Sequence, residues 1–463
     1  MEFSQMPEFL GLSLLLGLLA LVATAAVARG WLRAEERSGR PACQKANGFP
    51  SDKSSGSKKQ KQQQRIRKEK PQQHNFTHRL LAAALKSHSG NISCMDFSSN
   101  GKYLATCADD RTVRIWSTKD FLQREHRSMR ANVELDHATL NPAQDLEHRA
   151  SLSSERVTCL LPVSRAFIVW LANGDTLRVF KMTKREDGGY TFTATPEDFP
   201  KKHKAPVIDI GIADTGKFIM TASSDTTVLI WSLKGQVLST INTNQMNNTH
   251  AAVSPCGRFV ASCGFTPDVK VWEVCFGKKG EFQEVVRAFE LKGHSAAVHS
   301  FAFSNDSRRM ASVSKDGTWK LWDTDVEYKK QQDPYLLRTG RFEEAAGAAL
   351  CRLALSPDAQ VLALASGSSI HLYNTRRGEK EECFERAHGE CIADLAFDIT
   401  GRFLASCGDR AVRLFHNTPG HRAVVEEMQG LLKRASNDST RQRLQQQLTQ
   451  AQEALKSLGA LKK

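Results

Sequence analysis

Short apolar strands alternate with tight turns along most of this chain. Residues 208–212 form an alternating strand of this kind and residues 353–355 a continuous one. In each copy a turn and then a second strand follow, and examples of the second strand are 259–262 and 403–406. The turns carry glycine, asparagine, aspartate and proline, which are the residues that tight turns require. The pattern therefore predicts a protein built from antiparallel β-sheets.

An aromatic residue near the end of a strand marks each repeat of this pattern. Successive marks are 41 to 64 residues apart, and most gaps are near the period of about 40 to 50 residues that is typical of a β-propeller with one blade per repeat. One blade cannot bury both of its faces, so neighbouring blades stack into a ring. We therefore predict an all-β, seven-bladed propeller over residues 79–417, with the marking aromatic residues at Trp116, Phe180, Trp231, Trp272, Trp322, Tyr373 and Phe415.

The fifth copy, residues 293–323, is the most regular. It opens with Gly-His, has a turn at 305–307 and an Asp-Gly turn, and closes with Trp-Asp. This copy resembles a WD repeat, a family in which a His, a Ser or Thr, an Asp and a Trp form a hydrogen-bonded set that ties the strands of a blade together. The resemblance implies four sets: His88, Thr106, Asp110 and Trp116; His203, Thr221, Asp225 and Trp231; His294, Ser312, Asp316 and Trp322; and His388, Ser406 and Asp409, with Phe415 in place of Trp.

The remaining copies are degraded. The fourth offers His250 and Ser262, but its Asp268 lies too close to Trp272, and only the strand pattern supports the second and sixth. The WD resemblance also implies that residues 79–86 complete the last blade. It further implies that the residue before each structural Asp faces the narrow side, where partners bind. Those residues are Asp109, Ser224, Lys315 and Gly408, and Lys315, the one cation, suits an acidic or phosphorylated partner.

The N-terminus carries a long apolar segment. Residues 9–28 are uncharged and mostly apolar, which is long enough to cross a bilayer as a helix. Acidic residues precede the segment and arginines follow it, so the positive-inside rule predicts a luminal end at 1–8 and a cytosolic propeller. A cleaved signal peptide is the alternative, because Ala26-Val27-Ala28 resembles a cleavage site.

A basic segment joins the apolar segment to the propeller. Residues 29–74 hold 13 Lys or Arg against 4 Asp or Glu, and the whole chain has a net charge of +14. The composition predicts a disordered linker over 29–78. Three roles fit this linker: a solvated spacer, a segment that contacts anionic lipid headgroups, or a segment that contacts RNA phosphates. The candidate contacts are Lys58, Lys59, Lys61, Arg65, Arg67, Lys68 and Lys70.

The C-terminal tail, residues 418–463, has helical periodicity. A break near Asn437 separates two apolar stripes, and Ser439 with Gln442 has the spacing of a capping box. The second stripe, Leu444, Leu448, Ala451, Leu455 and Leu458, is heptad-like. It predicts a helix that packs on the propeller or a surface for a partner or for self-association.

The sequence offers little support for catalysis. No nucleophile-elbow, zinc-protease, phosphate-loop or dinucleotide motif is present. The histidines recur at blade openings, so the His, Ser and Asp of a blade are structural and not a repeated active site. None of the 11 cysteines forms a Cys-x-x-Cys pair, and Cys107, Cys263 and Cys407 occupy equivalent places in three blades, which predicts buried thiols and not disulfides. We predict a protein that is not an enzyme and binds no cofactor or metal.

The order of segments resembles a known membrane-anchored group of WD-repeat proteins. That resemblance implies a scaffold at the cytosolic face of the endoplasmic reticulum membrane, which assembles protein partners. Stress-signalling kinases, translation components and messenger RNA are the partners expected there. A ubiquitin-ligase substrate adaptor is one alternative, and a secreted or luminal propeller is another if the signal peptide is cleaved.

Overall fold

The computed structural model describes residues 75–459, except 111, 124, 127, 133–155, 164–165, 174–175, 185–189, 195–198 and 344–349. The predicted luminal end, the apolar segment 9–28 and the linker up to residue 74 lie outside the described residues. The side chains of strands 156–194 are also not described, apart from the buried Leu177.

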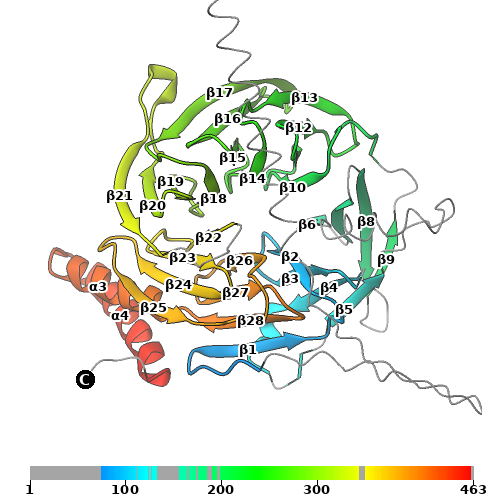
Figure 1. Ribbon diagram of the computed structural model, residues 1–463. Coiled ribbons are helices and arrows are strands. Elements are labelled where there is room, and N and C mark those ends of the chain that lie inside the picture. Colours follow the sequence, from blue (N-terminus) through cyan, green and yellow to red (C-terminus); the bar gives the residue numbers. More distant parts are fainter. Residues whose placement is uncertain are drawn as a thin grey trace, which may run out of the picture. The chain divides into compact units, whose positions relative to one another are not determined.

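The described strands form seven four-stranded antiparallel sheets, numbered here as blades 1 to 7, which surround a common centre (Figure 1). The first strand of each blade is innermost. Blade 1 is β2 (Ile92–Phe97), β3 (Tyr103–Ala108), β4 (Thr112–Ser117) and β5 (Ser128–Asn132); blade 2 is β6 (Arg156–Val163), β7 (Ala166–Asn173), β8 (Thr176–Lys184) and β9 (Tyr190–Ala194); blade 3 is β10 (Val207–Ile212), β11 (Ile219–Ser223), β12 (Thr227–Trp231) and β13 (Val237–Asn242).

The other blades continue around the ring. Blade 4 is β14 (Asn248–Val253), β15 (Phe259–Gly264), β16 (Asp268–Phe276) and β17 (Phe282–Lys292); blade 5 is β18 (Val298–Phe303), β19 (Arg309–Ser314), β20 (Thr318–Asp323) and β21 (Tyr335–Arg341); blade 6 is β22 (Arg352–Leu355), β23 (Val361–Ser366), β24 (Ser369–Asn374) and β25 (Lys380–Phe384). Blade 7 is β26 (Asp394–Phe397), β27 (Phe403–Cys407), β28 (Ala411–His416) and β1 (Leu81–Lys86). Each of the seven marking aromatic residues lies in the third strand of its blade.

The ring closes through its first strand. β1 pairs antiparallel with β28, with Ala84 opposite Arg413 and Lys86 opposite Ala411. The last blade is thus completed by the first strand of the described chain, which confirms the predicted closing strand at 79–86. Closure by a distant strand removes an open sheet edge from the last blade.

Hydrogen bonds between inner strands also join neighbouring blades. In several of them a side chain of one inner strand bonds the main chain of the next blade. Two of these side chains accept from a main-chain N–H: Asp209 Oδ2 from Ala251 at 2.9 Å, and Asp394 Oδ2 from Met95 at 3.2 Å. Two others donate to a main-chain carbonyl: Thr249 Oγ1 to Val298 at 3.0 Å, and Arg352 Nε to Ala393 at 3.0 Å. The ring is therefore held by polar contacts at its centre as well as by apolar packing between blades.

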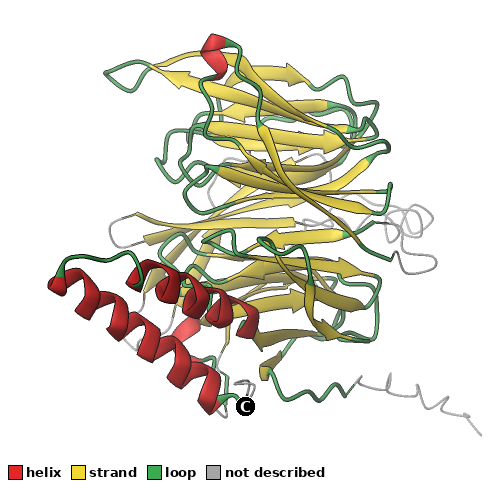
Figure 2. Cartoon of the chain, turned by 90° about the vertical axis from the view of Figure 1, so that its left-hand side faces the viewer, coloured by secondary structure: helices red, strands yellow, loops and turns green. Residues whose placement is uncertain are grey.

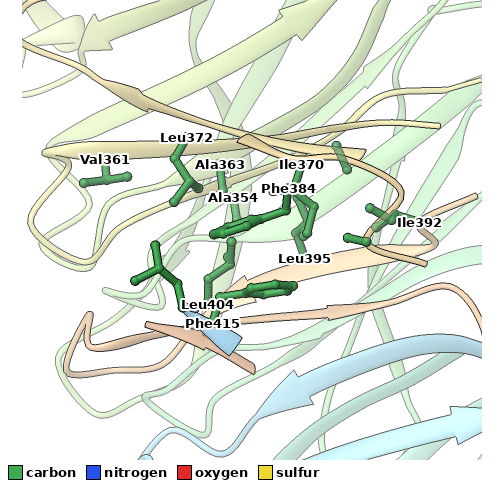
Figure 3. Close-up of a cluster of buried hydrophobic side chains, with 13 residues drawn as sticks. Ala354, Val361, Ala363, Ile370, Leu372, Phe384, Ile392, Leu395, Leu404 and Phe415 are labelled. Atoms are coloured by element: carbon green, nitrogen blue, oxygen red, sulfur yellow. The ribbon is translucent and has the colours of Figure 1, made fainter. Parts of the chain in front are cut away.

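The hydrophobic core lies between adjacent sheets. In the cluster between blades 6 and 7, apolar side chains of both sheets interdigitate, including Leu372, Leu395 and Leu404 (Figure 3). The Phe384 and Phe415 rings stack with centroids 4.2 Å apart. Such aromatic pairs add about 0.5–1.5 kcal/mol beyond the area they bury. Phe415 thus fills the place of the missing Trp by packing alone.

Two helices follow blade 7 and lie side by side on the outside of the propeller (Figure 2). α3 (Thr418–Leu432) begins at Asn417, whose side chain accepts from the N–H of Gly420, and α4 (Asp438–Ser457) begins at Asn437. The expected capping box from Ser439 to Gln442 is wrong, because Asn437 accepts the N–H of Ser439 and is itself the N-cap.

Ion pairs and apolar packing hold this helix pair. Arg422 on α3 pairs with Glu381 and Glu382 of β25, both at 2.9 Å. The stripe Leu444, Leu448, Ala451 and Leu455 on α4 is buried, and α4 packs along α3. The stripe is therefore used within the chain, and it would serve self-association only if the two helices separated.

The predicted single-pass architecture needs correction. Over the part of the chain that the structure describes, neither of the two helices has the length and apolarity needed to cross a bilayer. The predicted transmembrane helix and the predicted location at the endoplasmic reticulum membrane are accordingly not upheld. Both predictions depended on residues 9–28, which lie outside the described residues.

Candidate functional site

The hydrogen-bonded set of blade 5 shows what the WD-type residues do. Trp322 Nε1 donates to Ser312 Oγ at 3.0 Å, and Ser312 Oγ lies 2.8 Å from His294 Nε2. His294 Nδ1 lies 3.0 Å from Asp316 Oδ2. A tryptophan N–H can only donate and a carboxylate can only accept, so Ser312 donates to Nε2 and the His294 Nδ1–H donates to Asp316.

Blades 1 and 3 repeat this arrangement with threonine in place of serine. His88 Nε2 lies 2.8 Å from Thr106 Oγ1, which accepts from Trp116 Nε1 at 3.0 Å, and His88 Nδ1 lies 3.1 Å from Asp110. In blade 3 the corresponding distances are 2.7 Å from His203 Nε2 to Thr221 Oγ1 and 2.8 Å from Trp231 Nε1 to Thr221 Oγ1. Thr227 links the histidine to the carboxylate there, because its Oγ1 lies 3.2 Å from His203 Nδ1 and donates to Asp225 at 2.6 Å. The predicted sets of blades 1, 3 and 5 come together in space.

Hydrogen bonds and charge shift the pKa values of the set carboxyls. Partial burial opposes ionisation of Asp110, but hydrogen bonds from Thr112 and the Ser89 N–H, with His88 nearby, lower its pKa to about 2. The same balance lowers the pKa of Asp316 to about 2. Burial lowers the pKa of His294 in spite of its carboxylate partner, so the ring is neutral near pH 7.

Blade 7 has Phe415 in place of the tryptophan and adds a buried arginine to the set. Arg413 is buried, and its Nη1 lies 2.8 Å from Asp409 Oδ2 and 2.6 Å from His388 Nδ1. His388 Nδ1 also lies 3.2 Å from Asp409 Oδ1, and His388 Nε2 lies 2.7 Å from Ser406 Oγ. Burial opposes ionisation of Asp409, but His388 and Arg413 hold its pKa well below the usual range.

The set expected in blade 4 is wrong. His250 lies on the inner strand β14, where its Nδ1 is 3.0 Å from Asp209 of blade 3. Gln245 takes the histidine's place, accepting from Ser262 Oγ at 2.6 Å, and Asn248 accepts from Ser262 Oγ at 3.2 Å. The sequence does carry a signal for this difference, which is the number of residues between the histidine and the Ser or Thr of its set. The histidines of blades 1, 3, 5 and 7 precede their Ser or Thr by 18 residues and Gln245 precedes Ser262 by 17, whereas His250 is much closer to it.

These sets serve structure and leave no group poised for chemistry. Each histidine, serine and carboxylate of blade 5 is bonded to its neighbours in the set. The thiol of Cys263 is fully buried, and burial raises its pKa to about 12, which keeps it unreactive. No group of three or more His, Cys, Asp or Glu in the described ranges could hold a metal ion, and the described cysteines are free thiols.

The exposed residues next to the sets lie on one face of the ring. Because the strands are antiparallel, the connection into each blade and the turn between its second and third strands emerge on the same side, called here the upper face. Asp109 and Lys315 are exposed there, Ser224 is half-buried, and Gly408 is buried. A Cβ on Gly408 would lie 2.6 Å from the carbonyl oxygen of Cys391, so that position offers close packing and no exposed side chain.

Sequence reasoning missed two apolar residues on the upper face of blade 4. Met246, in the connection before β14, is 75% exposed, and Phe265, in the turn after β15, is 60% exposed. The two segments touch, since a Cβ on Gly264 would lie 1.9 Å from the carbonyl oxygen of Asn247. Isolated apolar residues in turns carry no periodic signal, so only the fold brings them together.

The opposite end of the ring holds a cavity of about 430 Å³. It is lined by the ends of the inner strands and the turns that follow them, and it has both apolar and acidic side chains: Phe97, Phe303, Phe397, Ile399, Asp209, Asp394 and Asp398 among others. Asp209 and Asp394 bond neighbouring inner strands, so these carboxylates hold the ring together.

The basic residues predicted to contact lipid or RNA, between 58 and 70, lie outside the described residues.

Comparison with known proteins agrees with this geometry. The family described as WD domain, G-beta repeat matches residues 79–117, 195–232, 285–323 and 380–416. The chain is 90% identical to transducin beta-like protein 2 of Homo sapiens and 84% identical to that of Mus musculus, over the full length of each chain. It is 22% identical to apoptotic protease-activating factor 1 of Homo sapiens over 72% of this chain and 26% of that protein. The chain belongs to the WD-repeat β-propeller family, with the transducin beta-like protein 2 chains among its relatives.

Proposed function

We propose that this protein is a scaffold that binds other proteins through the upper face of its propeller. WD-repeat propellers generally bind proteins and do no chemistry, and membership of that family supports the coarse assignment. A rigid surface that presents polar and charged turns from several blades suits such a role, because pre-ordered groups lose little entropy on binding.

One observation carries the proposal: buried hydrogen-bonded sets fix the turns that present the exposed residues. Asp109 directly precedes Asp110, which is bonded to His88 and Thr112, and Lys315 directly precedes Asp316, which is bonded to His294 and Thr318. The backbone that carries these exposed side chains is therefore fixed by hydrogen-bonded neighbours. This is the arrangement of a binding surface and not of a catalytic pocket.

Substitution of the exposed turn residues tests the scaffold. We expect the variant Asp109→Ala/Lys315→Ala to keep the thermal midpoint of the wild type and to lose a subset of the proteins recovered by proximity labelling. The control is Lys278→Ala/Lys279→Ala, two exposed lysines in the turn between β16 and β17 on the opposite side. An unchanged partner set in the first variant, with the control also unchanged, would count against binding through these turns.

The finer identity of the partners is part of the same proposal. The partner classes proposed are kinases and translation components, with RNA recruited through the basic residues 51–70. Phosphate contacts by lysine and arginine weaken steeply as salt rises. Deletion of 51–70 should lower the RNA that crosslinks to the protein while the proteins bound to the propeller stay the same. RNA recovery that is insensitive to the deletion would remove RNA from the proposal.

A further inference from the structure

The upper face of blade 4 differs from that of the other described blades. Its histidine is replaced by Gln245, and the connection that carries Gln245 also presents Met246 to solvent. Gln245 is fully buried and bonds Ser262 and the carbonyl of Asp268, so it fixes the connection as tightly as histidine does elsewhere. The substitution keeps the blade intact and changes what the connection displays.

The connection is anchored at both ends. Thr243 donates from its N–H to the carbonyl of Thr226 at 2.9 Å, and Lys270 Nζ donates to the carbonyl of Thr243 at 2.8 Å. Asn248 Nδ2 donates to the carbonyl of Ser223 in blade 3 at 2.8 Å. These bonds hold Met246 at a φ of 63°, a left-handed conformation that is strained for a methionine. The loop is thus pre-organised with its apolar side chain outward.

Positive charge flanks this apolar pair on both neighbouring blades. Lys202 and Lys204 are exposed in the connection into blade 3, and Lys315 is exposed on the upper face of blade 5. Lys292, at the end of β17 in blade 4, pairs with Glu290 at 3.2 Å. The nearby acids are engaged: Asp225 bonds Thr227, and Asp268 lies 3.9 Å from Lys270. The described surface around Met246 and Phe265 is therefore apolar at its centre and cationic at its rim.

We infer that Met246 and Phe265 form a docking site for an acidic peptide segment of a partner protein, one that carries an apolar anchor residue. The apolar pair would bury the anchor, and the surrounding lysines would contact the carboxylates, which is the usual division between an interface's core and its rim. This inference rests on the proposed scaffold function and gives it one site and one class of ligand.

Two other occupants fit less well. The chain's own basic segment, residues 29–74, has the same sign of charge as the rim and would be repelled. Single-stranded nucleic acid is bound by successive aromatic platforms with arginine or lysine between them. In the described part of this surface, Phe265 is the single exposed aromatic ring, and Met246 offers no flat face for a base.

The test is fluorescence anisotropy with purified full-length protein. The probe is a labelled glutamate-rich peptide that carries one leucine and one phenylalanine, and two control peptides replace either the apolar residues with serine or the glutamates with glutamine. We expect Met246→Ser/Phe265→Ser to weaken binding of the probe about tenfold, because a central apolar anchor dominates an interface of this kind. Lys204→Glu/Lys315→Glu should weaken binding more at low salt than at high salt.

Matched controls keep the result specific. Leu122→Ser/Leu233→Ser removes two exposed leucines from the opposite side of the ring and should leave the affinity within twofold. Equal affinity of the wild type and the Met246→Ser/Phe265→Ser variant would overturn the inference. So would tighter binding of a poly-uridine oligonucleotide than of the peptide, or a Met246-dependent dimer in light scattering.

The scaffold proposal and this site fail in different ways. If the Met246→Ser/Phe265→Ser variant binds the acidic peptide normally while the Asp109→Ala/Lys315→Ala variant loses partners in cells, the scaffold stands and the docking site is lost. If neither variant loses partners in cells, the upper face is not the binding surface.

Discussion

At the residue scale, the same hydrogen-bonded set tolerates different chemistry from one blade to the next. In blades 1, 3 and 5 a tryptophan donates to the buried hydroxyl. In blade 7 Arg413 donates to the aspartate, and in blade 4 Gln245 and Asn248 accept from the hydroxyl. In each of these five blades a buried hydroxyl of the second strand is satisfied by polar neighbours, because an unpaired buried polar group is costly. The constraint is therefore on hydrogen-bond saturation and not on residue identity.

Blade 7 should be the blade most sensitive to loss of its aspartate. Asp409→Ala would leave the buried Arg413 without its carboxylate, and an unpaired buried charge costs about 3–5 kcal/mol. Asp225→Ala should cost about 1–2 kcal/mol, because Leu229 stands at the position of Arg413 in blade 3. Urea unfolding of the two variants compares the costs.

A second substitution separates the charge effect from a general loss of packing. Asp409→Ala/Arg413→Leu removes the buried charge along with its partner, so it should recover part of the loss in the free energy of unfolding. A double variant that is as unstable as the sum of its single variants would contradict this account of blade 7.

The set carboxyls should also make stability depend on pH. The pKa values of Asp110 and Asp316 are about 2 in the folded chain against an ordinary 3.8, so their stabilisation is complete above about pH 4 and is lost as the pH falls toward 2. The lowered pKa of His294 adds a loss that begins as the pH falls below 6.5, since only the unfolded chain then takes up the proton.

Denaturant midpoints measured from pH 7 to pH 2 test this dependence. We expect the midpoint to fall throughout this range and most steeply below pH 4. Asp110→Asn/Asp316→Asn should flatten the steep part, because the amides do not titrate. A wild-type midpoint that is constant from pH 4 to pH 2 would show that these carboxyls are not differentially ionised.

At the element scale, each strand and helix is positioned by a small number of polar contacts that sequence periodicity does not reveal. The helix pair illustrates this: α3 is tied to β25 through Arg422, Glu381 and Glu382, while α4 contributes apolar side chains buried against α3. A short run of charged residues such as 379–382 is typical of a solvated face, yet Glu381 and Glu382 of this run anchor the tail.

Substitution in the α4 stripe should unfold the tail without unfolding the propeller. Leu448→Glu places a charge where the side chain is buried, so α4 should detach from α3 and lose amide protection over 438–457. Hydrogen exchange read by mass spectrometry reports both regions in one experiment. Gln446→Glu, which adds the same charge at an exposed position of α4, is the matched control. Loss of amide protection in the blades of the Leu448→Glu variant would contradict a tail that unfolds independently of the propeller.

Local patterns allowed the prediction of elements but not of contacts between them. The strands, the turns and the sets of blades 1, 3, 5 and 7 follow spacings within a single repeat, and these spacings are visible in the sequence. The role of His250 depends on Asp209 of another blade, and the pairing of Arg413 with Asp409 depends on side-chain rotamers. The apolar pair Met246 and Phe265 likewise needs the fold to bring two turns together.

At the scale of the whole molecule, the ring depends on one non-local pairing. Every other blade is a continuous stretch of chain, but blade 7 takes its outer strand from residues 81–86, far from β28 in sequence. β1 also contributes Leu85, which is fully buried among side chains of blades 1 and 7. Loss of β1 would therefore remove a strand, open an edge on β28 and leave an apolar gap.

Two truncated chains should separate this closure from the rest of the N-terminus. A chain that begins at residue 75 keeps β1 and should retain the cooperative unfolding of the full chain, whereas one that begins at residue 87 should unfold at a much lower temperature and aggregate through the exposed edge of β28. Adding a peptide of residues 75–86 in excess should raise the midpoint of the shorter chain, because a ligand that binds only the folded state stabilises it by mass action. Equal midpoints for the two chains would mean that β28 does not need its partner strand, and the ring would then be held by the blade-to-blade contacts alone.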